Sequence, residues 1–414
     1  MSSKKRSPLV IIFVTVFLDL VGFGIVIPVL PLYAERFGAS ALTVGLLLGI
    51  YSAMQAICAP LLGKLSDRIG RRPVLLVSLL GTAAGFLLMG LAHQLWLLFL
   101  ARIIDGVTGG NISTAQAYIA DVTPPEHRSK GMGLIGAAFG LGFIFGPAIG
   151  GLMSHISLAA PFLFAAALAA VNAIALYFLL PESLSPEHRH ASRRHEPLRS
   201  VVQPSHRWTL TAVVATYFFA TVAFSLLTAT YPLFTEHRFG YDARHNGYIF
   251  AGQGLLGAII QGGLMGRLVK ARGERWLVIA GTLALAVSLF ALPLSGTVTA
   301  LLVATAGMAL GHSLMAAPLN GLASQCVGAS AQGRVLGLMQ SAASFARIVG
   351  PVLGGWLLDV DAGRQATHYA QTPYWTGGTV MLAALALSTT LGRTRQQHAV
   401  LTPSAAVATM KETP

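Results

Sequence analysis

The chain has 414 residues, of which 54% are hydrophobic and only 10% are charged. About a quarter of the residues of a soluble domain are charged, so this composition excludes an ordinary soluble protein and indicates an integral membrane protein. Cys58 and Cys326 are the only cysteines and lie in apolar runs, which excludes a disulfide framework. The net charge of +13 would suit a nucleic-acid partner, but the distribution of the charges argues against one.

Twelve apolar runs follow one another along the chain, and each is long enough to cross a bilayer about 30 Å thick. The predicted spans are 9–33, 42–62, 73–93, 95–118, 131–153, 158–180, 208–235, 245–266, 276–295, 298–322, 333–358 and 373–392. An even number of spans places both termini on one side of the membrane. The first run does not fit a cleavable signal peptide, because it is too long and contains Asp19 and two prolines.

Lysines and arginines lie mainly on one side of these spans. With a cytoplasmic N-terminus, 22 of them fall in inner segments and four in outer loops, while Arg102 and Arg347 remain inside spans. Cytoplasmic loops carry an excess of basic residues. The pattern therefore predicts a multi-pass protein of the plasma membrane or cell inner membrane with both termini in the cytoplasm, and it explains the positive charge without nucleic acid.

The longest polar stretch separates the sixth and seventh spans. Its composition favours a solvated linker; a metal site is the alternative, but the histidines show no fixed ligand spacing. The predicted organisation is a cytoplasmic segment 1–8, a six-helix bundle 9–180, a cytoplasmic linker 181–207, a second six-helix bundle 208–392 and a cytoplasmic tail 393–414.

The two halves of the chain are related by sequence. The segment GPAIGG at 146–151 recurs as GPVLGG at 350–355. Residues 63–70 and 31–33 also match later segments of the chain, more weakly and at nearly the same offset. These matches indicate duplication of a six-span unit, and because six is even the copies run parallel. We expect an all-α integral membrane fold of twelve helices in two bundles, related by an axis along the membrane normal, with a polar pathway between them.

Four segments resemble motifs of one family. Residues 63–72 (GKLSDRIGRR) resemble the loop signature of the major facilitator superfamily and lie between the second and third spans, where that family carries it. Residues 102–106 resemble its fourth-helix motif, and 138–151 its fifth-helix antiporter motif. Residues 18–31 are similar to the first helix of the tetracycline-resistance branch of drug:proton antiporters. The resemblance implies the major facilitator fold and proton-coupled drug efflux by alternating access.

The loop motif predicts a cytoplasmic gate. Asp67 ends the second helix, where its carboxylate can sit against the positive N-terminus of a helix from the other half, and Asp121 is a candidate partner for Arg71. The resemblance implies that such contacts latch the inner face shut; a simple topology anchor is the alternative. The residues assigned to this gate are Gly63, Asp67, Arg68, Gly70, Arg71 and Asp121.

The antiporter motif is rich in small residues, which let helix backbones approach closely, and its proline can bend the helix. Tight packing is expected in any case, and the resemblance adds a hinge and a seal against ion leak. The residues assigned to the motif are Gly142, Gly146, Pro147, Gly150 and Gly151.

Three charged residues inside the first-half spans are assigned to proton coupling: Asp19, Arg102 and Asp105. An ionisable side chain in the bilayer is costly and suggests a function. Asp19 is predicted either to carry the proton or to belong to a buried ion pair. Asp105, three residues after Arg102, either takes part in coupling or simply neutralises that arginine.

Arg347 has no charged counterpart in the duplication, since the matching residue is Phe143. It is predicted to pair with Asp19 or Asp105, or to hold an anionic part of a cargo. Polar side chains at membrane depth are assigned, with Arg347, to a substrate cavity: Gln55, Asn111, Gln116, Gln253, Gln261, Asn320 and Gln340. For any one of the amides an interhelical hydrogen bond is the alternative. His312 is predicted to be a hydrogen-bonded core residue.

The tetracycline exporters that the chain resembles carry further acids in the third and ninth spans, but 73–93 and 276–295 contain none. Their absence argues against a cationic metal–tetracycline cargo and leaves amphipathic drugs, dyes and organic anions open.

No nucleotide-binding loop, catalytic arrangement or metal cluster is apparent. The prediction is therefore a monomeric secondary transporter in a lipid bilayer, not an enzyme and without a cofactor, that exchanges protons for amphipathic drugs. A symporter or facilitator for a small metabolite or organic anion is the alternative within transport, and a non-transporting membrane receptor is the alternative outside it.

Overall fold

The computed structural model describes residues 8–124, 127–184, 206–328, 331–365 and 368–391, and the regular structure of these residues is entirely helical. The predicted tail 393–414 and most of the segments 1–8 and 181–207 lie outside the described residues. The first half comprises α1 (Pro8–Glu35), α2 (Ala41–Ile69), α3 (Arg71–Gly90), α4 (Leu95–Thr108), α5 (Asn111–Val122), α6 (Arg128–Met153) and α7 (Ala160–Leu179). The second half comprises α9 (Arg207–Phe239), α10 (Ala243–Ala258), η4 (Ile259–Leu264), α11 (Met265–Arg272), α12 (Glu274–Ala291), η5 (Leu292–Leu294), α13 (Val298–Gln325), α14 (Gln332–Asp361) and α15 (Gln371–Thr389).

Eleven helical segments of the described chain are long and apolar enough to cross a membrane. The twelfth predicted span, 373–392, forms α15, which is a helix but does not meet the same hydropathy test. It packs against α9 and α12 of its own half, and the indole of Trp375 donates a hydrogen bond to the Phe290 carbonyl across 3.2 Å. The described chain thus forms one helix for each predicted span, apart from internal breaks in two of them.

The prediction of one continuous helix over 95–118 for the fourth span is wrong. The span divides into α4 and α5 at the pair Gly109–Gly110, where the low helix propensity of glycine favours a break. The break frees the Gly109 carbonyl, which accepts a 2.9 Å hydrogen bond from the Gln55 amide. Backbone that leaves the helix at this depth needs such a partner, because the bilayer core supplies no water.

The eighth span contains a second irregularity, the π-helical turn η4 between α10 and α11. It includes Gln261 and the pair Gly262–Gly263. Short π-helical turns are rare and occur often at functional sites. Sequence reasoning treated 245–266 as one continuous span and missed this turn.

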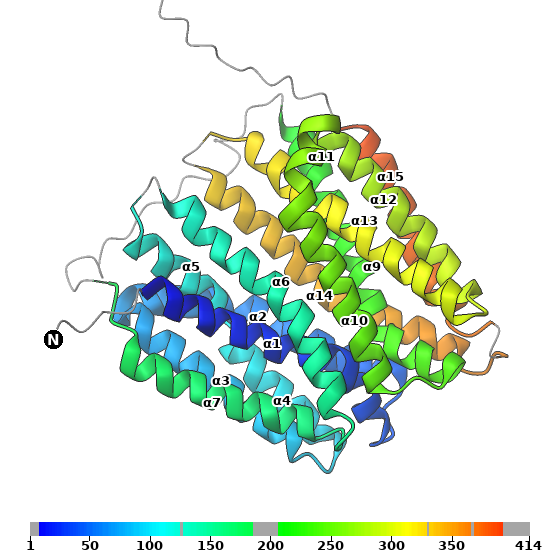
Figure 1. The fold of residues 1–414 in the computed structure, drawn as a ribbon, viewed down its shortest axis with the longest axis horizontal. Helices are drawn as coiled ribbons and strands as arrows, with labels where there is room; N and C mark the ends of the chain where they lie inside the picture. Colours follow the sequence, from blue (N-terminus) through cyan, green and yellow to red (C-terminus); the bar gives the residue numbers. More distant parts are fainter. Residues whose placement is uncertain (1–7, 125–126, 185–205, 329–330, 366–367, 392–414) are drawn as a thin grey trace, which may run out of the picture.

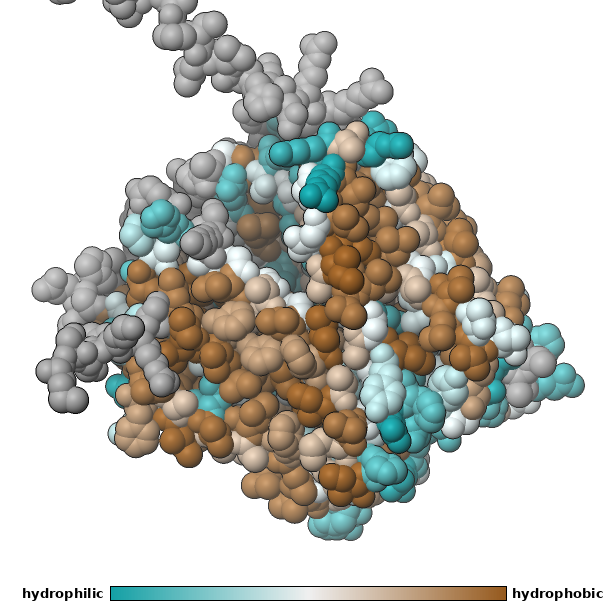
Figure 2. All heavy atoms as spheres, in the orientation of Figure 1, coloured by the Kyte–Doolittle hydropathy of each residue, from teal (hydrophilic) through white to brown (hydrophobic). Residues whose placement is uncertain are grey.

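The helices form two groups, α1–α7 and α9–α15, that meet at one end of the molecule (Figure 1). We call the end formed by loops 63–72 and 266–275 the basic end, and the opposite end the closed end. Between α6 and the α10–α11 segment the surface is hollowed towards the basic end (Figure 2).

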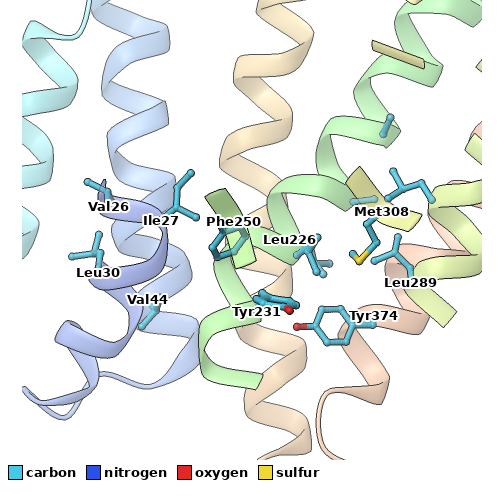
Figure 3. Close-up of a cluster of buried hydrophobic side chains, with 14 of the residues drawn as sticks. Val26, Ile27, Leu30, Val44, Leu226, Tyr231, Phe250, Leu289, Met308 and Tyr374 are labelled. Atoms are coloured by element: carbon cyan, nitrogen blue, oxygen red, sulfur yellow. The ribbon is translucent and has the colours of Figure 1, made fainter. Parts of the chain in front are cut away.

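The apolar core explains why the groups join at only one end. One large cluster draws residues from both groups, and Figure 3 shows Ile27 and Leu30 of α1 together with Phe250 of α10. Towards the basic end, the first group has a separate cluster of its own, which includes Ile12 and Tyr118. Shared burial of apolar surface therefore holds the two groups together at the closed end.

Candidate functional site

The seam between the groups is built from the duplicated glycine-proline motif. In α6 a Cβ on Gly146 would lie 2.7 Å from the Gly24 Cα of α1, within the same group, whereas a Cβ on Gly151 would lie 3.0 Å from the Gly247 Cα of α10, in the other group. One short stretch of helix therefore packs against both groups. Only a side chain as small as hydrogen allows both approaches.

The repeat copy in α14 makes the same two contacts. A Cβ on Gly350 would lie 2.6 Å from the Val222 carbonyl oxygen of α9, in its own group. A Cβ on Gly355 would lie 2.2 Å from the Ala41 carbonyl oxygen of α2, in the other group. The predicted close packing is confirmed, and the final glycine of each copy forms the seam between the groups.

A carboxylate joins the same two helices at the closed end. Asp359 of α14 accepts hydrogen bonds from the backbone N–H groups of Ala41 (2.9 Å) and Leu42 (3.0 Å), the first two residues of α2. The negative charge faces the positive end of the α2 dipole. Sequence reasoning missed this contact, because its partners are 318 and 317 residues apart.

At the basic end, the predicted contact between Arg71 and Asp121 is present, with 3.1 Å between Nε and Oδ2. Arg71 Nη1 also lies 2.5 Å from Oδ1 of Asp67, and it donates to the Ser66 hydroxyl across 2.7 Å. The Asp67 side chain is 62% exposed. Among the described residues, its ion-pair partner comes from its own loop and not from the other group.

The turn before α3 needs glycine at position 70. Gly70 has φ +112°, and a Cβ there would lie 2.3 Å from the Glu182 carboxylate. That carboxylate accepts hydrogen bonds from the N–H groups of Arg71 (2.9 Å) and Arg72 (3.1 Å). Of the other gate residues, Arg68 is exposed and Gly63 has open space around it.

Arg102 and Asp105 form a closed ion pair inside the first group. Arg102 is 1% exposed, and its Nη1 donates to Asp105 Oδ2 across 3.0 Å. The guanidinium also lies over the ring of Tyr51, 4.0 Å from its centroid. The predicted neutralisation of Arg102 by Asp105 is therefore present, and sequence reasoning missed Tyr51 as the third member of the cluster.

Asp19 of α1 is half-buried near this pair. It lies close to the side chain of Asn111, the first residue of α5, and within electrostatic reach of Asp105. Among the described residues no basic nitrogen lies within 4.0 Å of the Asp19 carboxylate. The start of α5 thus places the Asn111 amide beside a carboxylate that has no ion-pair partner among the described residues.

The prediction that Arg347 pairs with Asp19 or Asp105 is wrong, because Arg347 of α14 pairs with neither. Within the described chain it has no carboxylate within 4.0 Å, and its Nη2 donates to the Ser344 hydroxyl across 3.1 Å. The phenols of Tyr217 and Tyr51 lie within electrostatic reach of its guanidinium. Tyr51 is thus within reach of charged side chains from both groups.

The amides assigned to the cavity differ in their hydrogen bonds and in their exposure. Gln55 bonds the Tyr51 hydroxyl (3.1 Å) as well as the Gly109 carbonyl, and Asn320 bonds the Ala316 carbonyl within its own helix (3.0 Å). The Gln253 amide nitrogen is buried without a partner in the described structure. The remaining amides differ in exposure: Asn111 is buried, whereas Gln116, Gln261 and Gln340 are exposed.

His312 differs from its prediction as a hydrogen-bonded residue. Its ring stacks on Phe224, with 4.2 Å between centroids. Its Nδ1 is buried and has no hydrogen-bond partner in the described part of the chain. The contact that holds the imidazole is therefore aromatic.

Two helical groups sealed together at one end, with a hollow at the other and charges at mid-depth, define a membrane transporter of the alternating-access class. The profile of the Major Facilitator Superfamily matches residues 12–272 and again residues 217–410. The chain belongs to that superfamily.

The chain is also similar to individual members of the superfamily and to solved structures. The chain is 42% identical to the class C tetracycline resistance protein of Escherichia coli, over 67% of this chain and 71% of that protein. It is 31% identical to multidrug resistance protein 2 of Bacillus subtilis (strain 168), over 93% of this chain and 95% of that protein. A crystal structure of the human organic anion transporter MFSD10 (TETRAN) is 25% identical, covers 94% of this chain and 100% of its own, and has a TM-score of 0.68.

Proposed function

We propose that the protein exports amphipathic small molecules, tetracycline-like compounds among them, in exchange for protons. Its similarity to tetracycline and multidrug resistance proteins supports drug export. We place it in the plasma or cell inner membrane as a single functional chain, with both termini and the basic end in the cytoplasm, in agreement with the excess of basic residues there.

This orientation assigns a transport state to the structure. The closed end faces outward, and the hollow between α6 and α10 opens to the cytoplasm. Seven glycines in the basic-end parts of α6, the η4 turn and α14 have open space around them, since a Cβ added to any of them would meet no atom of a neighbouring element within 4 Å: Gly133, Gly136, Gly140, Gly262, Gly263, Gly333 and Gly337. Cargo therefore enters from the cytoplasm in this state.

Two carboxylates suit the two gates of the cycle. Asp359 stands two residues before the end of α14 and binds the N-terminus of α2. Asp67 stands two residues before the end of α2, which runs antiparallel to α14, so the N-terminus of α14 is the matching site when the inner face closes. Asp359 would hold the outer gate in the present state, and Asp67, together with Arg71 and Asp121, the inner gate in the alternate state.

The position of Asp19 is the observation that supports proton coupling. Asp19 is half-buried, it has no basic partner among the described residues, and it lies beside a closed Arg102–Asp105 pair that already satisfies its own charge. Such a carboxylate can take up a proton or a cation without breaking an existing ion pair. We therefore assign the exchanged proton to Asp19, with Arg102 and Asp105 holding the surrounding helices.

Organic-anion transport is a second candidate. Arg347, which faces no carboxylate within 4.0 Å in the described structure, favours it, as does the similarity to a human organic anion transporter. A symporter would accumulate an anion along with protons, whereas the exporter moves its cargo against the proton flux.

Tetracycline uptake into inside-out vesicles, containing the purified protein, tests the proposal. An acidic interior should drive accumulation, a protonophore should abolish it, and ATP should not restore it. Vesicles without protein are the control. Accumulation that persists after the pH gradient is dissipated would contradict proton exchange, and accumulation driven by an alkaline interior would favour symport.

A further inference from the structure

The mid-depth charges of the two groups have opposite signs. With all three groups ionised, Asp19, Arg102 and Asp105 give the first group a net charge of −1. In the described helices of the second group, the Asp, Glu, Lys and Arg side chains lie near the helix ends, except Arg347. The pathway between the groups thus has an acidic wall and a basic wall.

The Arg102–Asp105 pair is not available to a ligand. Arg102 is 1% exposed, its guanidinium is bonded to Asp105 across 3.0 Å, and Tyr51 covers it. A cargo that displaced either partner would leave the other charge buried and unpaired, which is strongly unfavourable. The charges left to meet a cargo are Asp19 and Arg347.

These two side chains share one region although they come from different groups. Both are half-buried, and within the described chain neither has an oppositely charged group within 4.0 Å. The Tyr51 hydroxyl is within electrostatic reach of both. A guanidinium kept at membrane depth without a carboxylate is costly, and a bound anion would offset that cost.

The surroundings of Arg347 suit a flat aromatic body. The phenol of Tyr217 lies within electrostatic reach of the guanidinium, and the Asn320 side chain contacts that phenol. About two helical turns further along α9, Phe224 stacks on His312. Aromatic side chains of this kind can stack on a conjugated ring system, while the guanidinium fork can bind a planar carboxylate or enolate through two hydrogen bonds.

We propose that the cargo is an amphipathic aromatic zwitterion, whose cationic group binds at Asp19 and whose anionic group binds at Arg347. The inference rests on the proposed function, because the cationic group replaces the exchanged proton on Asp19. It also fits the lack of acids in 73–93 and 276–295. A zwitterion needs one carboxylate and one cation from the protein, whereas a net cation would need acids alone.

The equilibrium binding of two matched dyes to the purified protein tests whether the site prefers a zwitterion. The first dye is a rhodamine with a free carboxylate, a zwitterion at neutral pH, and the second is the methyl ester of the same dye, a cation. Since a charge-assisted hydrogen bond contributes a factor of about 10–100, the wild type should bind the acid more tightly than the ester by about that factor.

Variants of Arg347 test whether this side chain causes the preference for the acid over the ester. Arg347→Gln should remove the preference by weakening the acid while leaving the ester unchanged, and Arg347→Lys should keep part of it. Arg244→Gln changes an exposed arginine of the same group and should behave as wild type. Equal weakening of both dyes by Arg347→Gln, a wild type without preference, or binding of neither dye overturns the proposal.

Failure of the proposed function gives a different result. Dye binding is measured at equilibrium without a gradient, whereas proton exchange is measured as gradient-driven tetracycline uptake by wild-type vesicles. Loss of uptake with an intact dye preference overturns proton-driven export alone. Intact uptake without a dye preference overturns the zwitterion site alone.

Discussion

The contact of Asp359 with α2 predicts that this one carboxylate biases the transport cycle. Asp359→Asn removes the charge but preserves the shape and one acceptor oxygen. In the present state the carboxylate bonds two N–H groups across the seam, at 2.9 and 3.0 Å. We expect the variant to fold normally and to populate states in which the closed end has opened.

The magnitude follows from the two bonds. Hydrogen bonds to a charged group contribute about 1.5–3 kcal/mol, and a charge at a partly buried helix end contributes up to about 2 kcal/mol. Because asparagine keeps one acceptor, we expect a net loss of about 1–2 kcal/mol. That loss shifts the ratio of open to closed outer ends by about 5–30-fold.

Distances between spin labels at Ser157 and Gly296 provide the assay, since these residues lie in closed-end loops of different groups. Cys58 and Cys326 are the free cysteines and are replaced first. Asp242→Asn is the matched control, because Asp242 caps α10 at the same end but within its own group, by accepting from the His245 N–H across 3.0 Å. A folded Asp359→Asn protein with the wild-type distance distribution would refute the reasoning.

Three further predictions concern other contacts. Gly355→Val adds a side chain whose Cβ would lie 2.2 Å from the Ala41 carbonyl oxygen, so the outer end should not close and transport should be lost; normal spin-label distances would contradict this. Arg102→Gln leaves Asp105 buried without its partner and should lower the free energy of unfolding by about 3–5 kcal/mol in detergent; unchanged thermal stability would show that the pair is dispensable. Asp67→Asn alters an exposed side chain, so stability should be unchanged while uphill uptake falls about tenfold or more through loss of the inner latch; wild-type uptake in vesicles would remove Asp67 from the gate.

Sequence patterns predicted the features that depend on composition and local spacing. The apolar runs located the helices, because a span must bury its backbone over the whole bilayer thickness. The Arg71–Asp121 and Arg102–Asp105 contacts followed from charges placed at one loop or on one helix face. The duplicated glycine motif predicted close packing, and both copies pack closely.

Features that depend on contacts between distant segments could not be predicted in this way. The break at Gly109–Gly110 is stable because Gln55 of another helix bonds the freed carbonyl. The Asp359 bonds require the last turn of α14 to lie beside the first turn of α2. Tyr51 carries no charge, so nothing in the sequence singled it out, although it lies within electrostatic reach of charged side chains from both groups.

The most direct test of the account compares two modes of transport by Asp19→Asn in the same vesicles. The asparagine mimics a permanently protonated carboxylate, so the variant can change between states but cannot release a proton. The account predicts no accumulation driven by an acidic interior. Exchange of labelled for unlabelled tetracycline should persist at weakened affinity, because Arg347 still binds the anionic group, and the protein should be as stable as wild type. Gradient-driven accumulation at the wild-type rate would contradict the assignment of the exchanged proton to Asp19.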